Sequence, residues 1–348
     1  MTASARRFAL GSYTPDGPGP ALHLAERSES GEWRIVASTT ASNPSFVARS
    51  GELLFAVGED ASGSVASFRI VEGGADGAGA ALEPVDSVEH GEADPCHIAV
   101  DAASGLVLVA NYTGGSVTAV PFESSGALGR PATLRLPPRT GPVTDRQDAP
   151  HAHQVVPTPW GTHLVSDLGG DAIHELVVER ATDVSGPALR IVRTIDVAPG
   201  TGPRHLLVRS GLVHVIGELD GHLHTFEVDA ASARPAGTEP VVVDPSNGAD
   251  DVVQPSHLDA SLSGRLFTAL VRGRDTVSVF EATDAARPRL ASEHPIGAAW
   301  PRHHAHLDDR TVVVAAERTH ALVEVDLVTG AARRVLEVTS PTCVLPLD

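Results

Sequence analysis

One pattern repeats along the whole chain of 348 residues. Each copy reads as a proline, a polar or aromatic pair, a short apolar run, a turn, and a second apolar run that ends in a polar residue. The prolines that open the copies recur every 40 to 55 residues, at Pro44, Pro95, Pro150, Pro203, Pro255, Pro301 and Pro341. A period of this length indicates a repeat architecture, in which each copy buries its apolar surface against its neighbours.

A further alternating run follows most of these hairpins, as in "GSVASFRI", "GSVTAVPF" and "DTVSVFEA". Another strand-like segment then precedes the next proline. Each copy therefore supplies about four short strands, which is typical of one blade of a β-propeller. The predicted fold class is all-β, a seven-bladed β-propeller with four-stranded antiparallel blades.

The seventh copy is incomplete, because "TCVLPL" supplies a single strand and the chain then ends. The N-terminal segment "RFALGSYT" has the pattern of a second strand. We expect these two segments to pair in the last blade, because closing the ring removes exposed sheet edges. Residues 1–348 are then predicted to form one propeller domain, with the polar segment 139–149 as a loop between strands.

Charge and lysine content narrow the possible functions. The formal net charge is −18, which disfavours nucleic acid and anionic membranes as partners. The chain has no lysine, so its 26 fixed side-chain cations are all arginines. Schiff-base chemistry and lysine-dependent phosphate loops are thereby excluded. Two distant cysteines and the lack of an apolar N-terminal core predict a cytoplasmic location.

Polar residues mark the strand ends that should face one mouth of the central channel. The innermost strand of a blade runs along the channel and the second strand runs back beside it, so the start of one lies beside the end of the other. The starts carry Cys96, His97, His151, His153, Arg204, His205, Ser256, His257, Arg302, His303 and His304. The ends carry Tyr13, Glu59, Asn111, Tyr112, Asp167, Glu218, Arg272 and Glu317. Such a ring of imidazoles, arginines and carboxylates predicts a binding pocket or an active site.

The histidines of this ring allow a structural and a functional interpretation. Five of them fall in one column when the copies are aligned on the following apolar run: His97, His153, His205, His257 and His303. A side chain that recurs in most blades can serve the repeat itself, so both roles stay open for this column. Arg204, Glu218 and Arg272 instead differ between blades, and an arginine facing a channel needs an anionic partner. His151 adds a second imidazole beside His153, which favours function for that pair.

Several segments resemble the lactonase family of seven-bladed propellers: "DPCHIAVDAASGLVLVANYTGGSVTAVPF", "APHAHQVV", "GTGPRHL", "GEL" and "VRGRDTVSVF". This family includes propeller-type bacterial 6-phosphogluconolactonase and fungal carboxy-cis,cis-muconate cyclase, and the resemblance runs from Phe8 to the C-terminus. It implies a lactone hydrolase for a small anionic sugar-acid lactone. The family's proposed site residues fall on the pair His151 and His153 and on Arg204, Glu218 and Arg272. The chain departs from the family at "GEL" and "VRG", where an asparagine often precedes the acid or the arginine.

The predicted catalytic residues are His153, Arg204, Glu218 and Arg272. Arg204 or Arg272 would stabilise the oxyanion, Glu218 or His153 would deprotonate water, and an imidazolium would protonate the leaving oxygen. Predicted substrate contacts are His97, His151, Asp167, His205, His257, Arg302 and His303. The prediction includes no cofactor and no metal.

Three alternatives stay open. A lactonising cyclase of the muconate type can use the same groups as a hydrolase. A non-catalytic propeller would use the channel mouth to bind a ligand or a protein. A metal-dependent hydrolase would use oxygen ligands for Ca²⁺ or Mg²⁺, namely Glu59, Asn111, Asp167 and Glu218, although the arginines at the same mouth argue against it.

Overall fold

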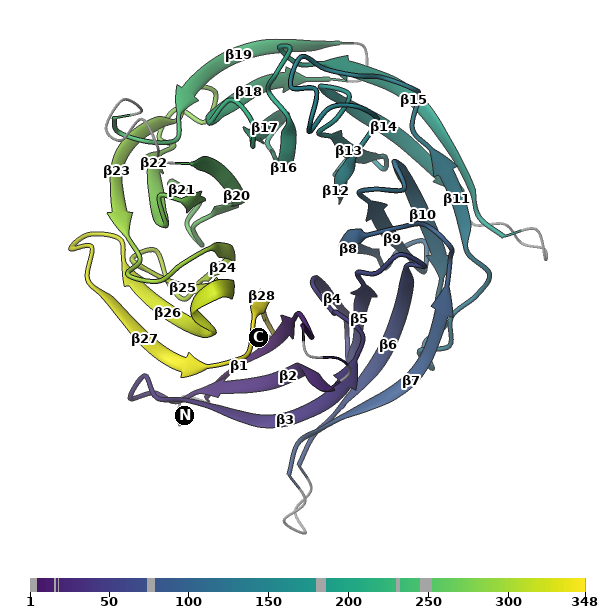
Figure 1. Ribbon diagram of the computed structural model, residues 1–348, viewed down its shortest axis with the longest axis vertical. Helices are drawn as coiled ribbons and strands as arrows, with labels where there is room; N and C mark the ends of the chain where they lie inside the picture. The colour runs from purple at the N-terminus through teal and green to yellow at the C-terminus, as the bar shows by residue number, and fades with distance from the viewer. Residues whose placement is uncertain are drawn as a thin grey trace.

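The computed structural model describes residues 5–15, 17, 19–73, 79–179, 186–229, 232–244 and 252–347. In these ranges, 28 strands form seven four-stranded antiparallel sheets arranged in a ring (Figure 1). The one helical element of the described chain is a 3₁₀ turn, η1 (Glu317–Thr319). The predicted seven-bladed β-propeller is confirmed. No helix in the described chain is both long and apolar enough to cross a membrane.

Six blades consist of consecutive strands, ordered here from the channel outward. The first two contain β4 (Val47–Ser50), β5 (Leu53–Gly58), β6 (Ser64–Val71) and β7 (Ala81–Glu89), then β8 (Pro95–Asp101), β9 (Leu106–Asn111), β10 (Ser116–Pro121) and β11 (Ala132–Arg135). The next two contain β12 (Ala152–Pro157), β13 (His163–Asp167), β14 (Ala172–Glu179) and β15 (Ala188–Asp196), then β16 (Pro203–Arg209), β17 (Leu212–Gly217), β18 (His222–Val228) and β19 (Ala233–Pro240). The last two contain β20 (Val253–Ala260), β21 (Leu266–Gly273), β22 (Thr276–Glu281) and β23 (Arg289–Pro295), then β24 (Pro301–His306), β25 (Thr311–Ala316), β26 (Ala321–Asp326) and β27 (Ala332–Glu337).

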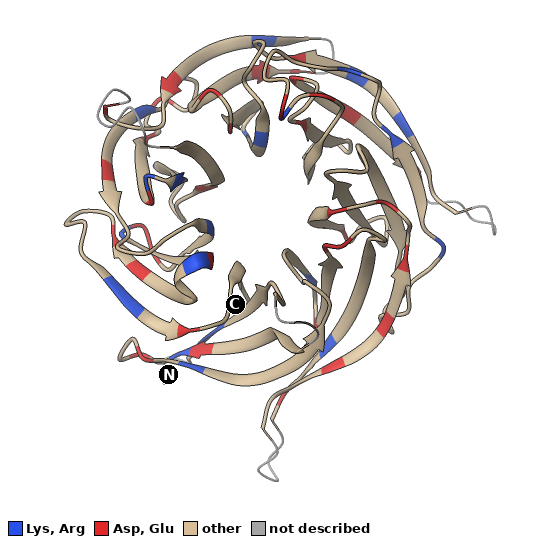
Figure 2. Cartoon of the chain, viewed as in Figure 1, with Lys and Arg blue, Asp and Glu red and all other residues tan. Residues whose placement is uncertain are grey.

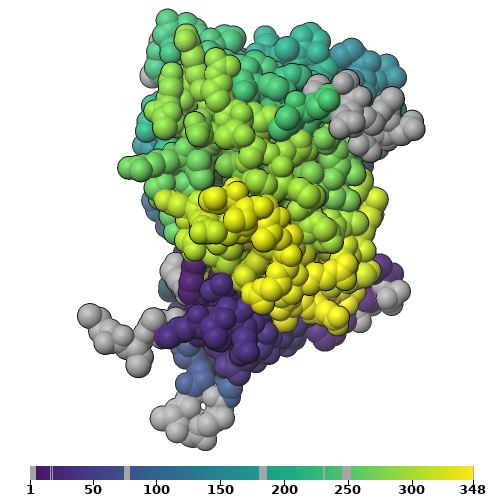
Figure 3. All heavy atoms as spheres, turned by 90° about the vertical axis from the view of Figure 1, so that its left-hand side faces the viewer, coloured from purple at the N-terminus to yellow at the C-terminus, as the bar shows by residue number. Residues whose placement is uncertain are grey.

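The seventh blade joins the two ends of the chain. It contains β28 (Pro341–Pro346), β1 (Arg6–Ser12), β2 (Gly19–Arg27) and β3 (Trp33–Ala41). β1 pairs antiparallel with β28, so that Leu10 lies opposite Val344. Figure 3 shows the yellow C-terminal segment directly against the purple N-terminal segment. The predicted closure is confirmed, and the N-terminal part contributes three strands of this blade.

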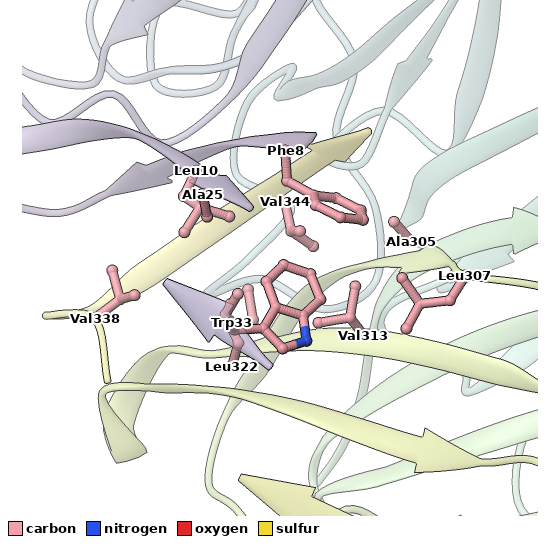
Figure 4. Packing of buried hydrophobic residues seen from close by; sticks show 11 residues of the cluster. Phe8, Leu10, Ala25, Trp33, Ala305, Leu307, Val313, Leu322, Val338 and Val344 are labelled. Atoms are coloured by element: carbon pink, nitrogen blue, oxygen red, sulfur yellow. The ribbon is translucent and has the colours of Figure 1, made fainter. Parts of the chain in front are cut away.

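Apolar side chains between neighbouring blades hold the ring together. The second strands β5 and β9 are buried along their whole length, whereas the outer strand β15 alternates between exposed and partly buried positions. At the closure, Phe8 packs against Trp33 with 4.6 Å between ring centroids, among apolar side chains from both adjoining blades (Figure 4). The Trp33 Nε1–H donates to Glu324 Oε1 at 2.8 Å. The last seam is therefore sealed by the same kind of packing as the others.

A β-bulge near the start of the inner strands brings side chains to the channel mouth. The pairing of β8, β12, β16 and β24 with the second strand shifts by one residue after the first pair. The extra residue is Cys96, His153, Arg204 and Arg302, respectively. A bulged residue has no partner across the ladder, and the bend re-aims its side chain. Local backbone geometry thus places these four side chains.

The pairing corrects one part of the predicted alignment. Ala152, and not Pro150, occupies the position that Pro203 has in the next blade. His153 therefore belongs to the column of Arg204, and Gln154 takes the place of the repeated histidine. Aligning on the proline shifted the column, because alternation alone does not reveal where the bulge inserts its extra residue.

Candidate active site

A cavity of about 380 Å³ lies at one mouth of the channel. Part of its lining consists of bulged residues of inner strands, namely Cys96, His153, Arg204 and Arg302, and of residues that follow a second strand, namely Glu59, Tyr112 and Glu218. The charged residues of its lining are Glu59, Asp94, Arg146, Arg204, Glu218, Arg272 and Arg302. The volume is in the range of pockets that hold small molecules.

The Glu218 carboxylate is the centre of this cavity's charge network. Arg204 Nη1 donates to Oε2, and Arg146 Nη2 donates to Oε1 at 2.7 Å. Arg272 Nη2 lies 2.9 Å from Oε2 but makes no aligned hydrogen bond. The Glu218 side chain is only 2% exposed. Burial alone would raise the pKa of Glu218, but Arg272, Arg204 and their neighbours hold it well below its usual range.

Three guanidinium groups therefore surround one carboxylate. Burial and the nearby Arg204 lower the pKa of Arg272 to about 9, which leaves it charged at neutral pH. The Arg272 guanidinium carbon lies 5.3 Å from the centre of the Trp300 ring, where a cation–π contact stabilises it. The excess of positive charge makes this wall of the cavity a site for an anion.

His153 is neutral in this environment. Its Nε2 accepts a hydrogen bond from Arg204 Nη1 at 2.7 Å, so the proton of the ring is on Nδ1. Burial and the Arg204 charge lower the pKa of His153 well below its usual value. The imidazolium that the sequence suggested as a proton donor is therefore not the resting form. The neighbouring Cys96 is a thiol and not a thiolate, since burial raises its pKa.

A second polar network lies on the opposite side of the ring, in the blades that flank and form the closure. Arg302 Nη2 donates to the Tyr13 hydroxyl at 2.6 Å, and this hydroxyl donates to Glu59 Oε1 at 2.9 Å. Glu317 Oε2 lies 3.5 Å from Arg302 Nε. The other oxygen of Glu59, Oε2, is buried and has no hydrogen-bond partner among the described residues. Glu59 therefore has one carboxylate oxygen with no hydrogen-bond donor in the described part of the chain, whereas both oxygens of Glu218 accept from arginines.

Four of the repeated histidines form a cluster of packed rings with Phe46 beside the cavity. The Phe46 and His97 ring centroids are 4.2 Å apart, and those of His257 and His303 are 3.8 Å apart. Burial lowers the pKa of His97 and of His303 to about 3, so these rings are uncharged at neutral pH. Of the four, only His205 lines the cavity. The predicted substrate contacts His97, His257 and His303 thus lie in this neutral cluster and not in the cavity lining.

The structure places two other predicted contacts away from the cavity lining. Asp167 is fully buried and accepts hydrogen bonds from the backbone N–H groups of His151 and Gly170 at 2.8 and 2.9 Å. It ends β13 one position before the channel mouth, where Leu168 stands in the place that Glu218 has in the next blade. Asp167 therefore holds a turn. His151 stacks on the Tyr112 ring at 4.4 Å and supports that lining residue.

The alternative set of oxygen ligands is not brought together. Asn111 and Asp167 are buried inside their blades, where Asn111 Nδ2 donates to Ser116 and Thr118. The carboxylate of Glu218 is occupied by arginines. Among the described residues, these four positions do not form a group of ligands.

Arg146 is the site residue that sequence reasoning missed entirely. It lies in segment 139–149, where Gln147 is buried and its Nε2 donates to the Leu168 carbonyl at 3.0 Å. This anchor holds the loop over the channel mouth and brings Arg146 to Glu218. A residue in a loop has no counterpart in other blades, so the repeat carries no signal for it. Figure 2 shows that acidic and basic positions both occur on the outer strands and on the strands near the centre of the ring.

Comparison with known proteins agrees with this architecture. The model of the family described as "Lactonase, 7-bladed beta-propeller" matches residues 7–346. The chain belongs to this family. A curated relative, the 6-phosphogluconolactonase of Bacillus subtilis, is 27% identical over 271 residues, which are 75% of this chain and 73% of the relative.

Solved structures of this lactonase type share the fold. A candidate 6-phosphogluconolactonase of Bacteroides fragilis superimposes with a TM-score of 0.86 at 24% identity, covering 100% of this chain and 99% of the other. The periplasmic gluconolactonase of Pseudomonas aeruginosa gives a TM-score of 0.85 at 22% identity, covering 99% of both chains. At this level of sequence identity, the comparison shows a shared propeller fold and does not identify the substrate.

Proposed function

We propose that this lactonase hydrolyses 6-phosphogluconolactone or a closely similar anionic sugar-acid lactone. The observation that carries the proposal is the group of Arg146, Arg204 and Arg272 around one buried carboxylate, at a cavity in a protein whose net charge is −18. A positive site on so acidic a surface favours an anionic small molecule as its ligand. The activity named for the Bacillus subtilis relative supports the same substrate.

The proposed reaction is the addition of water to the lactone carbonyl. Negative charge builds on the carbonyl oxygen, the ring C–O bond then breaks, and the proton taken from water ends on the leaving ring oxygen. Arg272 suits the role of oxyanion donor, because its Nη2 has no aligned hydrogen bond. Arg146 is the most exposed arginine of the group, at 28%, so it suits a contact with the phosphate of the substrate.

Three residues, Glu218, His153 and Glu59, are candidates for the base that removes the proton from water. Glu218 is a poor base, because its pKa is depressed and arginines hold its lone pairs. The Nε2 lone pair of His153 is likewise held by Arg204. We therefore assign water activation to Glu59, whose Oε2 is free and whose Oε1 is fixed by the Tyr13 hydroxyl. Glu218 and His153 then position the arginines.

The test is the rate of lactone opening by the purified protein, with the uncatalysed rate subtracted. We expect hydrolysis of 6-phosphogluconolactone, and a lower kcat/KM for gluconolactone, which lacks the phosphate. Arg272→Lys keeps the charge but loses the planar fork, so it should lower kcat/KM by about 10²-fold or more. Arg289→Lys is the matched control, since Arg289 pairs with Glu239 on the exposed surface.

If the protein hydrolyses neither of the two lactones, the proposal is refuted, and a propeller that binds a ligand without catalysis becomes the better interpretation. Equal loss of activity in Arg272→Lys and Arg289→Lys would refute the assigned role of Arg272.

A cytoplasmic location is also a proposal. It is supported by two cysteines that are free, Cys96 and Cys343, with Cys343 fully buried. Cell fractionation with an antibody against the native protein would test it, and recovery from the periplasmic or extracellular fraction would contradict it.

A further inference from the structure

A second group of chemically active side chains lies between two neighbouring blades. Asp259 is on β20, and His304 and His306 are on β24. One ligand atom from each lies within 4.8 Å of the others. Both histidines are buried, whereas Asp259 is partly exposed. Among the described residues, no arginine forms an ion pair with Asp259.

Hydrogen bonds fix which nitrogen of each ring carries the proton. His306 Nδ1 lies 3.3 Å from the Asp308 carbonyl oxygen and can only donate to it. The backbone N–H of His304 donates to His257 Nδ1 at 3.4 Å, so that nitrogen is an acceptor. His304 Nδ1, at 3.0 Å from the same His257 nitrogen, must therefore be the donor. Both rings keep an unshared lone pair on Nε2.

These two lone pairs meet at one hydroxyl group. Thr268 Oγ1 lies 2.7 Å from His304 Nε2 and 2.8 Å from His306 Nε2. A hydroxyl has a single hydrogen and can donate to only one of the two rings. The other buried Nε2 is left without a donor, beside a carboxylate that is also an acceptor. Buried acceptors that outnumber donors are costly in a native protein, and a bound cation satisfies several of them at once.

We propose that Asp259, His304 and His306 bind a divalent transition-metal ion, with Zn²⁺ as the best match. Two imidazoles and one carboxylate are ligands that suit zinc, whereas Ca²⁺ and Mg²⁺ take mainly oxygen. Each ligating ring donates its Nδ1–H to a carbonyl or to a second imidazole, as ligating histidines do. The Thr268 hydroxyl, which already contacts both Nε2 atoms, or a water would supply the fourth ligand.

None of the three ligands lines the lactonase cavity. His304 contacts His257 of the histidine cluster beside that cavity, and Asp259 and His306 lie further along their inner strands than His257 and His303. The ligands come from two blades, Asp259 from one and the two histidines from the next. The ion would thus fasten the β20 blade to the β24 blade, and its role is stabilisation of the ring.

The experiment uses the full chain, freed of metal with a chelator and then titrated with Zn²⁺ alone. We expect elemental analysis to find one Zn²⁺ ion per chain, and Tm to rise with the Zn²⁺ concentration. When Co²⁺ replaces Zn²⁺, we expect visible absorption bands that are typical of four-coordinate Co²⁺. Competition with a chromophoric chelator gives the affinity. Asp259→Asn and His306→Gln should each weaken Zn²⁺ binding by about 100-fold or more, since even outer partners of a metal site contribute 10- to 100-fold.

His224→Gln is the matched control, because His224 forms a separate pair with Asp220 at 2.7 Å. This variant should bind Zn²⁺ like the wild type. Wild-type protein that binds no Zn²⁺ and gives no Co²⁺ spectrum would overturn the proposal, whether or not the variants fold. Unchanged affinity in both Asp259→Asn and His306→Gln, or loss of binding in His224→Gln, would overturn it as well.

Discussion

Replacing Glu218 with glutamine should expose how tightly the arginine group depends on one charge. The change keeps the side-chain size and removes the only carboxylate that Arg146, Arg204 and Arg272 share in the described structure. Arg204 and Arg272 are buried, so their charges would be left without a partner in a dry environment. Breaking a buried ion pair from one side costs about 3–5 kcal/mol.

This cost converts into a measurable shift. Unfolding entropy is about 2.1 cal/mol/K per residue near 60 °C, so a chain of 348 residues loses about 1.4 °C of Tm per kcal/mol. Glu218→Gln should therefore lower Tm by about 4–7 °C. Inorganic phosphate should restore more of the Tm in this variant than in the wild type, because the site gains one net positive charge and binds the anion more strongly. Differential scanning calorimetry at several phosphate concentrations measures both effects.

Glu324→Gln is the control, because it also removes a carboxylate that is paired with arginines but lies outside the proposed anion site. Glu324 is buried and accepts hydrogen bonds from Arg27 at 2.7 Å and Arg333 at 3.0 Å, but it does not line the cavity. Glu324→Gln should lower Tm, but phosphate should raise the Tm of this variant no more than it raises that of the wild type. The reasoning fails if Glu218→Gln melts like the wild type, or if phosphate rescues Glu324→Gln to the same extent.

The pH dependence follows from the direction of the pKa shift. The folded-state pKa of Glu218 is depressed, so its contribution to stability is present above the unfolded value of about 4.3 and is lost as the pH falls through the folded value. The stability difference between the wild type and Glu218→Gln should therefore be constant near neutral pH and shrink in strong acid. A difference that instead grows on acidification would contradict the assigned ion pairs.

Three further predictions follow from the fold and the site. Deletion of residues 1–14 removes β1 and exposes the edge of β28, so soluble folded protein should be lost, and a truncated chain with wild-type Tm would contradict the closure. Glu59→Gln should lower kcat by about 10²-fold with little change in Tm, since it removes the proposed base and leaves the arginine group intact; wild-type kcat in this variant would return the role of base to Glu218 or His153. Exhaustive chelation should leave lactone hydrolysis unchanged while it removes the Tm gain from Zn²⁺, and activity that needs Ca²⁺ or Mg²⁺ would refute the metal-independent reaction.

The ring, its closure and the mouth that carries the charges were predictable, because they depend on the repeat period and on antiparallel pairing. Side-chain placement was predictable only to within one residue. Asp167 was assigned to the mouth and lies one position short of it, and His153 was aligned with His97 although it shares the column of Arg204. Both errors have one cause, since the position of a bulge depends on backbone pairing that alternation does not encode.

The protonation states of the site residues and the position of Arg146 could not be predicted from the sequence, for other reasons. Glu218 is buried, and this burial, which the sequence does not reveal, decides both its pKa and the cost of replacing it. Burial likewise makes the repeated histidines neutral, which a list of residues at strand ends cannot reveal. Arg146 reaches the site because Gln147 anchors an irregular loop, and no periodic pattern precedes that contact.

The charge balance of the arginine group explains why a phosphorylated lactone is the better proposed substrate. Three guanidinium groups face one resident carboxylate, which leaves two positive charges without a partner. A phosphate monoester carries about two negative charges at neutral pH, so its entry would neutralise the group. A gluconolactone without phosphate offers only the transient charge of its oxyanion, and its ground-state complex leaves the net positive charge of the arginine group uncompensated. Discrimination should therefore appear mainly in KM, because the phosphate is bound equally before and during the reaction. A difference confined to kcat would mean instead that the arginines act on the reacting carbonyl alone and that the phosphate binds elsewhere.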